Sequence, residues 1–226
     1  MRSQFPTFFI LAVLVASCGS GEHHSHEHHT DDNPSNIHMN HNSFEELVKS
    51  FEDPERADWQ KPELVLAQLG DLNGKVVGDI GAGTGYFSFL MAAQGANVVA
   101  IDVDERFIAY MEERKERDGV ETLSTRLVGY DDPGLGDGEF DVLLIVNTYH
   151  HFNDKVDYLK KCRQGLKEGG TLMIVDFKKE EMPIGPSIEH KVFGEAIQKD
   201  LEEAGFVQVE VDANILPFQY IIRTGS

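Results

Sequence analysis

The chain has few of the residues on which small secreted folds and zinc sites depend. Its 226 residues include two cysteines, one tryptophan and eight prolines. Two cysteines cannot form a disulfide framework, and no CxxC pair is present to bind zinc. Positive charge is also scarce, because 20 Lys and Arg face 39 Asp and Glu, which gives a net charge of −19. Nucleic acids and anionic lipids would repel such a chain, so we expect neither as a partner.

What is present fits one folded domain preceded by a tail. Hydrophobic residues make up 41% and charged residues 26% of the chain, which is too apolar for a wholly disordered protein. The length suits one domain of about 150–200 residues with an extension. We therefore expect a single acidic domain that acts on a small molecule.

Residues 1–17 have the pattern of an export signal. Arg2 precedes an apolar run over residues 8–16, which is shorter than the about 20 residues of a membrane span but typical of a signal peptide. The run ends in Val15-Ala16-Ser17-Cys18 and resembles the lipobox of bacterial lipoproteins, where lipid is attached to the cysteine. We expect an enzyme anchored in the cell envelope through Cys18 and facing the periplasm. A cleaved signal without lipid and a buried helix stay open, and an unused signal would leave the protein in the cytoplasm.

Residues 18–42 are interpreted as a flexible, histidine-rich linker. Neutral imidazole binds zinc, copper or nickel, but no rigid frame spaces these side chains, and a solvated low-complexity segment is the simpler interpretation. We predict no defined metal site and leave weak metal binding by the tail open. Seven of the ten histidines lie here, namely His23, His24, His26, His28, His29, His38 and His41.

Strand and helix patterns alternate through residues 43–226, the predicted catalytic domain. A capping box begins a short helix at Ser43, and five further helices are predicted at 62–69, 86–94, 104–117, 153–166 and 187–204. Strands are predicted at 75–80, 97–101, 123–128, 140–146, 172–177, 206–211 and 218–222. This alternation predicts an α/β, doubly wound, Rossmann-like sheet with its ligand at the carboxyl ends of the strands. No helix separates the last two strands, so they should form an antiparallel pair at one edge.

A glycine-rich turn joins the first predicted strand to the next helix. It reads Asp79-Ile80-Gly81-Ala82-Gly83-Thr84-Gly85. Glycine permits positive φ angles and a close approach of a ligand to the backbone, and the helix that follows offers unpaired N–H groups. The second strand ends at Asp102, whose carboxylate can accept hydrogen bonds from both hydroxyls of a ribose. The pattern indicates a nucleoside site, and a bare strand–helix turn is the alternative.

The spacing of the glycines distinguishes between nucleosides. A dinucleotide site requires GxGxxG, whereas this turn reads GxGxG, and Asp79 would repel a pyrophosphate but could bind an ammonium group. The turn resembles the first motif of class I S-adenosylmethionine-dependent methyltransferases, especially small-molecule enzymes of the ubiquinone/menaquinone-biosynthesis type. The resemblance covers roughly residues 55–223, and it implies a seven-stranded sheet with the last strand antiparallel and S-adenosylmethionine as cofactor. An NAD-dependent dehydrogenase is a weaker alternative.

The resemblance also implies a set of cofactor-binding residues. Asp131, rather than Asp132, is expected near the adenine amino group, and Asn147 opens the segment that follows the fourth strand. Asp79 and Asp102 could instead cap the helices that follow them. The full predicted set is Asp79, Gly81, Ala82, Gly83, Gly85, Asp102, Val103, Asp131 and Asn147.

Methyl transfer from a sulfonium is a direct displacement, so the protein must orient the reactants and, for some acceptors, remove a proton. A histidine with a pKa near 6.5 suits that task. Tyr149 and His150 follow the fourth strand and face either substrate or core, and we predict His150 as the general base. In the family, a histidine that matches His151 tends to be structural.

His190 is a second candidate for the substrate wall, and Trp59 either covers the pocket or packs in the core. The acidic surface favours a nonpolar or cationic small-molecule acceptor. A non-catalytic envelope lipoprotein that binds metal through its tail is the alternative function.

Overall fold

The computed structural model describes residues 1, 33–36 and 42–225. The predicted export signal, the lipid site at Cys18 and most of the histidine-rich linker lie outside these residues. Asp31–Ser226 form one compact unit. This unit includes residues 33–36 as well as the domain predicted from residue 43 onward.

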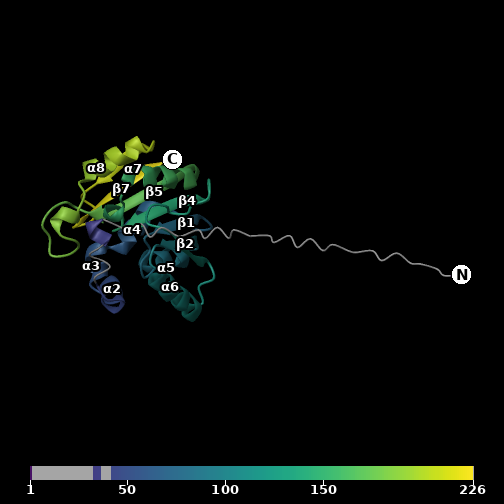
Figure 1. Cartoon of the computed structure of the whole chain (residues 1–226). Helices are drawn as coiled ribbons and strands as arrows, with labels where there is room; N and C mark the ends of the chain where they lie inside the picture. Colours follow the sequence, from purple (N-terminus) through teal and green to yellow (C-terminus); the bar gives the residue numbers. More distant parts are fainter. Residues whose placement is uncertain (2–32, 37–41, 226) are drawn as a thin grey trace. The chain divides into compact units, whose positions relative to one another are not determined.

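A seven-stranded sheet forms the centre of the domain (Figure 1). Its spatial order is β3-β2-β1-β4-β5-β7-β6, and only β7 runs antiparallel to its neighbours β5 and β6. This confirms the predicted fold and the antiparallel pair. The strands are β1 (Val76–Ile80), β2 (Asn97–Asp102), β3 (Leu123–Leu127), β4 (Phe140–Val146), β5 (Leu166–Phe177), β6 (Val207–Asp212) and β7 (Gln219–Gly225).

Helices cover both faces of the sheet, as a doubly wound topology requires. The helices are α2 (Phe44–Phe51), α3 (Arg56–Gln60), α4 (Pro62–Leu69), α5 (Tyr86–Ala93), α6 (Glu105–Asp118), α7 (Lys155–Gly165) and α8 (Gly194–Glu203). In Figure 1, α7 and α8 lie above the sheet and α5 and α6 below it. Successive residues of β4 point to opposite faces, so Leu144 joins the core under α4 and α5 while Leu143 joins the core under α7 and α8.

Side-chain caps set the start of several helices. Ser43 and Glu46 form the predicted capping box at α2. Asp104 caps α6 by accepting a hydrogen bond from the backbone N–H of Arg106 at 2.9 Å. The alternative in which Asp102 caps α6 is therefore wrong.

The segment predicted as one helix over residues 187–204 is divided. A short 3₁₀ turn, η2 (Ile188–His190), is followed by extended backbone at Lys191 and Phe193, and only then by α8. Lys191 is buried, and its Nζ donates to the carbonyl of Glu180 at 3.0 Å, which holds the segment in this form. The apolar spacing that includes Ile188 and Phe193 was misleading, because both side chains are exposed.

The helix predicted over residues 153–166 is α7. It ends one residue earlier, at Gly165, because Leu166 pairs with Phe140 and begins β5. A side chain at residue 165 would crowd Leu135, since a Cβ there would lie 2.7 Å from its Cδ1.

Among the described residues, no helix combines the length and apolar character that crossing a membrane would need.

Candidate active site

The glycine-rich turn connects the carboxyl ends of three strands. After β1, the backbone N–H groups of Gly81 and Ala82 donate to the carbonyl of Ile101 on β2, at 2.8 Å and 3.1 Å. Gly81 has a φ of 73°, and a Cβ there would overlap the side chain of Thr148, which follows β4. Only glycine fits this position, because the backbone is left-handed and a neighbour occupies the space of a side chain.

Asp102 at the end of β2 holds the turn in place. Its Oδ2 accepts a hydrogen bond from the backbone N–H of Gly83 at 2.7 Å, and its Oδ1 accepts one from the N–H of Asp104 at 3.0 Å. Burial raises the pKa of this carboxyl group, and the backbone N–H groups oppose the rise. A carboxylate has about four lone-pair positions, so each oxygen can accept a further hydrogen bond.

Asp79 lies on β1 beneath the same turn and is 2% exposed. Its Oδ2 accepts a hydrogen bond from Ser88 Oγ at 2.6 Å. Burial raises the pKa of Asp79 to about 6, which the Ser88 hydrogen bond partly offsets. Gly85 occupies the N-cap position of α5 and no side chain caps that helix, so the alternative in which Asp79 is the cap is wrong.

Arg56 on α3 brings a partly buried positive charge toward Asp79. Its guanidinium lies 4.3 Å from the ring centre of Tyr86, the first residue of α5. It donates to Gln60 Oε1 at 3.0 Å and to the carbonyl of Phe51 at 2.9 Å. Within the described residues no carboxylate forms an ion pair with it. Arg56 is partly buried, and a guanidinium removed from water without an anion is costly, so this position suits a ligand that carries a negative group.

Asn147 is tied into a chain of three amide side chains. Gln60 Nε2 donates to Gln219 Oε1 at 2.8 Å, and Gln219 Nε2 donates to Asn147 Oδ1. The chain links α3, β7 and the end of β4, and Gln60 and Gln219 have no exposed surface. The structure thus places Asn147 at the predicted strand end, with its side-chain oxygen engaged by the protein.

Thr84 is the one described residue with a buried side-chain oxygen that lacks a hydrogen-bond partner. It stands in the glycine-rich turn between Gly83 and Gly85 and is 1% exposed. Val103, which follows Asp102, is half-buried, as is Ala82. These residues bring an unsatisfied hydroxyl and apolar surface to the same turn.

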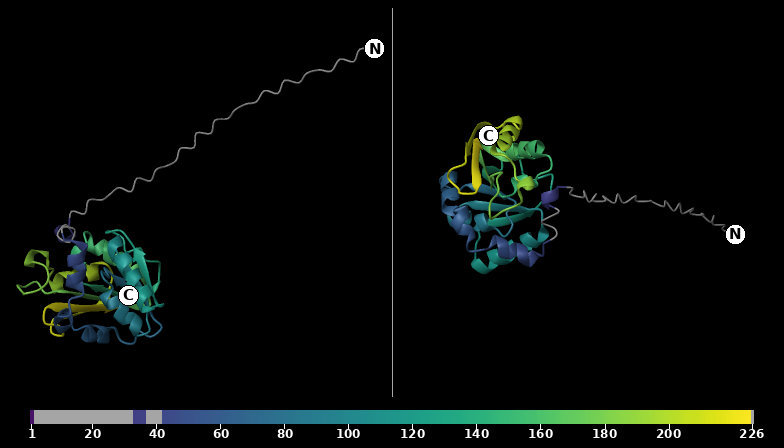
Figure 2. Two further views of the ribbon diagram at one scale, coloured as in Figure 1. Left: turned by 90° about the horizontal axis from the view of Figure 1, so that it is seen from below. Right: turned by 90° about the vertical axis from the view of Figure 1, so that its left-hand side faces the viewer.

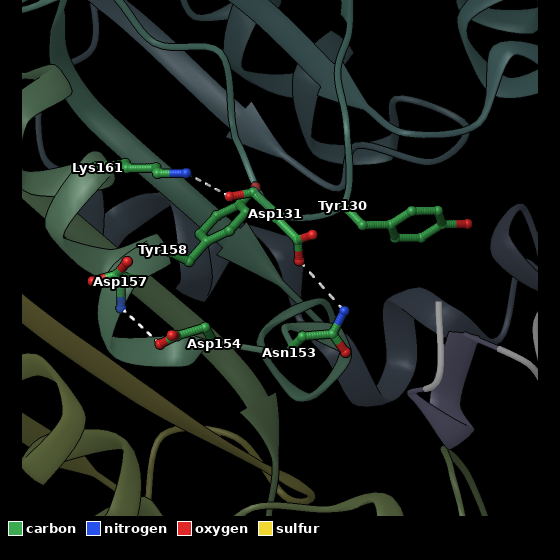
Figure 3. Close-up of a pocket in the computed structure, with 7 residues that line it drawn as sticks. All are labelled: Tyr130, Asp131, Asn153, Asp154, Asp157, Tyr158 and Lys161. Carbon is green, nitrogen blue, oxygen red and sulfur yellow. Dashed lines mark hydrogen bonds between the residues drawn. The ribbon is translucent and has the colours of Figure 1, made fainter. Parts of the chain in front are cut away.

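Asp131 lines a cavity of about 220 Å³ beside α7, and the described residues of the glycine-rich turn are not part of its lining (Figure 3). The carboxylate of Asp131 accepts a hydrogen bond from Asn153 Nδ2 at 3.4 Å, and its carbonyl accepts one from Lys161 at 2.8 Å. Tyr158 lines the same cavity. Its pKa is raised mainly by burial, with smaller effects from Cys162 and from Asp132, Asp102 and Asp131. Asp131 lines this cavity and Asp132 does not.

The two candidate catalytic residues after β4 are both buried, and each is hydrogen-bonded to a different aspartate. Tyr149 faces the core with no exposed surface, and its hydroxyl donates to Asp200 on α8 at 2.6 Å. Burial raises its pKa first, followed by the Asp200 hydrogen bond. This position removes Tyr149 from the groups that could touch a substrate.

His150 forms a pair with Asp176, which lies near the end of β5. The Nδ1 atom of His150 is 2.9 Å from Asp176 Oδ1, and its backbone N–H donates to Oδ2 at 3.1 Å. Both side chains are almost fully buried. Burial alone would raise the pKa of Asp176, but His150 and nearby N–H groups bring it below its ordinary value. The Nε2 atom of His150 makes no hydrogen bond to any described residue.

The remaining candidates line the edge of this region. His190 Nδ1 lies 3.2 Å from the hydroxyl of Ser35. Trp59 packs against Phe177, with 5.8 Å between ring centres. Cys162 lies on α7 and is buried in the core that this helix covers. The right-hand view of Figure 2 faces this side of the molecule, with α2 and α3 in blue and residues 178–193 in yellow-green.

Sequence reasoning found the residues of the glycine-rich turn and the acids on β1 and β2. It missed Arg56 as a charge, along with Gln219 and Asp176. These three lie on separate elements, and no local motif marks them. The one available signal was that Asp176, like Asp79 and Asp102, stands near the end of a buried strand.

Comparisons with known proteins agree with this geometry. Residues 78–174 match the family model described as a methyltransferase domain. The chain is 33% identical over 117 residues to the tRNA U34 carboxymethyltransferase of Desulfotalea psychrophila. This match covers 51% of this chain and 36% of that protein. It is 30% identical over 140 residues to the demethylmenaquinone methyltransferase of Tropheryma whipplei, which covers 62% of this chain and 56% of that protein.

The fold is also similar to a solved structure, a SAM-dependent methyltransferase from Aquifex aeolicus. The TM-score is 0.75 at 25% identity, and the match covers 81% of this chain and 98% of that one. The first curated relatives are longer, and the chain spans about a third to a half of their length.

Proposed function

Because the chain carries a class I S-adenosylmethionine-dependent methyltransferase domain, we propose that it methylates a hydroxyl group of a small molecule, with His150 as the general base. The observation that carries this proposal is the His150–Asp176 pair at the ends of β4 and β5. Thr148, two residues before His150, packs against Gly81, so the base stands beside the cofactor turn.

The residues at the turn fit the chemistry of this cofactor. S-adenosylmethionine, when bound, supplies a sulfonium-activated methyl group for direct displacement. Its amino-acid end carries one positive and one negative group, which match the buried Asp79 carboxylate and the partly buried Arg56 guanidinium. Asp102 has lone pairs for ribose hydroxyls, and the unsatisfied Thr84 hydroxyl offers another hydrogen-bonding group.

The His150–Asp176 pair suits proton removal from a hydroxyl. Since the carboxylate of Asp176 accepts from Nδ1, the proton of the neutral imidazole resides there and Nε2 keeps its lone pair. Proton uptake at Nε2 then creates an imidazolium that Asp176 stabilises. General-base catalysis of this kind contributes about 10²–10⁴-fold to a rate.

A small-molecule acceptor is supported by the likeness to a demethylmenaquinone methyltransferase and by the net charge of −19. The likeness to a tRNA-modifying enzyme makes tRNA the competing acceptor. The net negative charge of the chain argues against tRNA as the acceptor, because binding to its phosphates requires clustered Lys and Arg.

The decisive experiment has two stages. Calorimetry of the full chain with S-adenosylhomocysteine tests cofactor binding. Transfer of labelled methyl from S-adenosylmethionine is then measured with catechol, 4-hydroxybenzoate and unmodified tRNA as acceptors. We expect binding, and transfer to a phenolic acceptor that falls about 100-fold in His150→Gln. The control variant His190→Gln should keep its rate. Absence of cofactor binding, or full activity of His150→Gln, contradicts the proposal, and transfer to tRNA alone would reassign the acceptor.

We further propose that residues 1–18 direct export and that Cys18 is lipidated, on the strength of the Val15-Ala16-Ser17-Cys18 pattern. Metabolic labelling with a radioactive fatty acid should mark the wild-type chain and not Cys18→Ser. Equal labelling of the two, or none in either, argues against the anchor.

A further inference from the structure

The turn at residues 33–36 is bound to the histidine pair by contacts that the proposed mechanism leaves unused. Asn33 Nδ2 donates to the carbonyl of His151 at 2.8 Å, and Asn36 Nδ2 donates to the same carbonyl at 3.1 Å. Ser35 and Asn36 are each only 5% exposed. The turn is therefore packed against the segment that follows β4, although it lies 115 residues earlier in the chain.

Asn36 also determines which nitrogen of His151 carries the proton. The amide of Asn36 presents its Nδ2 to the His151 carbonyl, so its Oδ1 faces His151 Nδ1, at 2.6 Å. An amide oxygen can only accept, so Nδ1 must donate. The Nδ1 atom of His151 therefore carries a proton.

The two imidazole rings lie against each other, with 4.3 Å between their centres. Burial is the largest cause that lowers the pKa of His151 to about 3; His150, His190 and Lys155 contribute in the same direction, and Asp176 opposes them. A charged ring at this distance would repel a proton arriving on His150. A neutral His151 therefore leaves His150 free to take up the proton of the acceptor.

We propose that Asn36 is a positioning residue for the base, which holds His151 as a neutral imidazole protonated on Nδ1 and through it fixes the ring of His150. This inference rests on the proposed function, since it assigns a partner to the same base. It also adds a residue from the segment that precedes Ser43 to the residues that support the proposed active site.

The test is a nitrogen NMR study of the imidazoles in the full chain, which reports the tautomer and the titration of each histidine. His150→Gln and His151→Gln assign the two signals. Asn36→Leu removes both hydrogen bonds, and Asn36→Asp keeps the acceptor but adds a negative charge. Asn97→Asp adds the same charge as a control, because Asn97 is exposed and lies at the amino end of β2, opposite to the carboxyl ends of the strands.

In the wild type and in Asn97→Asp, we expect His151 to stay neutral with its proton on Nδ1 between about pH 5 and about pH 8. In Asn36→Leu the preference for Nδ1 should be lost. In Asn36→Asp the pKa of His151 should rise by about 2 units, and proton uptake by His150 should become weaker. A His151 that titrates near 6.5 in the wild type, or that is unchanged in Asn36→Leu, overturns the inference.

Binding of S-adenosylhomocysteine separates this inference from the proposed function. Neither Asn36 variant should change that affinity. If the wild type fails to bind S-adenosylhomocysteine while the tautomer results hold, the function is wrong and the positioning role of Asn36 stands.

Discussion

Asp79 and Asp102 end neighbouring strands, and their carboxylates meet the same glycine-rich turn from different sides. Asp102 accepts hydrogen bonds from the backbone of the turn and of Asp104, whereas the hydrogen bonds to Asp79 come from Ser88 alone. This difference makes Asp79 the more costly of the two charges to bury without a ligand. A charge held at such a cost is a common feature of binding sites.

Asp79→Asn should therefore stabilise the ligand-free protein while weakening cofactor binding. The pKa of Asp79 is raised from 3.8 to about 6, so the folded state binds its proton more tightly than the unfolded state. The ionised Asp79 carboxylate therefore destabilises the folded state by at most about 3 kcal/mol. This destabilisation is fully present above about pH 6 and disappears as the pH falls toward 4. Urea unfolding should show the Asp79→Asn variant more stable than wild type at about pH 8 and nearly equal at about pH 4.

Asp58→Asn is the matched control, because Asp58 is exposed on α3. It should change stability little at either pH. Equal stability of wild type and Asp79→Asn at the higher pH would mean that the buried charge is already compensated.

The sequence identified Asp79 and Asp102 because a local motif marks them, with glycines between the two acids. No local sequence motif surrounds Arg56 or Asp176. Their roles come from the packing of α3 over α5 and from the pairing of β4 with β5. Tertiary contacts of this kind cannot be read from the spacing of one segment.

Among the elements, α2 and α3 are the parts that cover the glycine-rich turn. The ring of Phe51, the last residue of α2, lies beside Gly83, where a Cβ would approach it to 3.1 Å. Phe51 also stacks on Phe107 of α6, with 5.5 Å between ring centres. The cover is thus held by aromatic packing on one side and by Arg56 on the other.

Gly83→Ala should destabilise the domain by strain and by contact with α2. Its φ of 56° alone costs an alanine about 1 kcal/mol or more. Gly74→Ala is the matched control, since Gly74 has a φ of 74° and no neighbour within 4 Å of a Cβ. Urea unfolding should show that Gly83→Ala lowers the free energy of unfolding more than Gly74→Ala does. This difference should disappear when Phe51 is also replaced by alanine. If both variants lose the same free energy of unfolding, then α2 can shift away from the new Cβ without destabilising the domain.

The cap of α6 offers a second test at this scale. Asp104→Ala removes the acceptor for the backbone N–H of Arg106 and should cost about 1 kcal/mol. Asp104→Ser should recover most of it, and Glu105→Ala, in the same turn, should be nearly neutral. Thermal melts in which Asp104→Ser is no more stable than Asp104→Ala would exclude a capping role.

Elements were predictable where one local signal dominates. The run of Val, Leu and Ile over 140–146 and the capping box at Ser43 gave correct elements. The predicted helix over 187–204 failed, since a long-range contact between Lys191 and Glu180 competes with its helical spacing. The antiparallel pair at the edge of the sheet could be predicted because no helix separates the last two strands, whereas the spatial order of the other strands is known only from the structure.

For the whole molecule, the charge of −19 is the dominant electrostatic property. Ion pairs such as Arg126–Glu139 and Lys167–Asp141 neutralise only part of it, and most acids remain on the surface. The excess repels itself more strongly in the compact state than in the unfolded chain.

Salt should therefore stabilise the protein. Raising the ionic strength from about 0.01 M to about 0.15 M shortens the screening length from about 30 Å to about 8 Å. We expect the melting temperature to rise by a few degrees in sodium chloride, and a similar rise in potassium chloride would show that the effect is not specific to one ion. A melting temperature that falls with salt would mean that attractive pairs outweigh the repulsion.

The position of β7 has a consequence for how the protein is made. This strand comes after β6 in the chain but lies between β5 and β6 in the sheet. The edge strand β6 has therefore no sheet to join until residues 219–225 have emerged from the ribosome. Until β7 has joined the sheet, β5 would present an unpaired edge, and a chaperone that shields such an edge would be most useful during that interval.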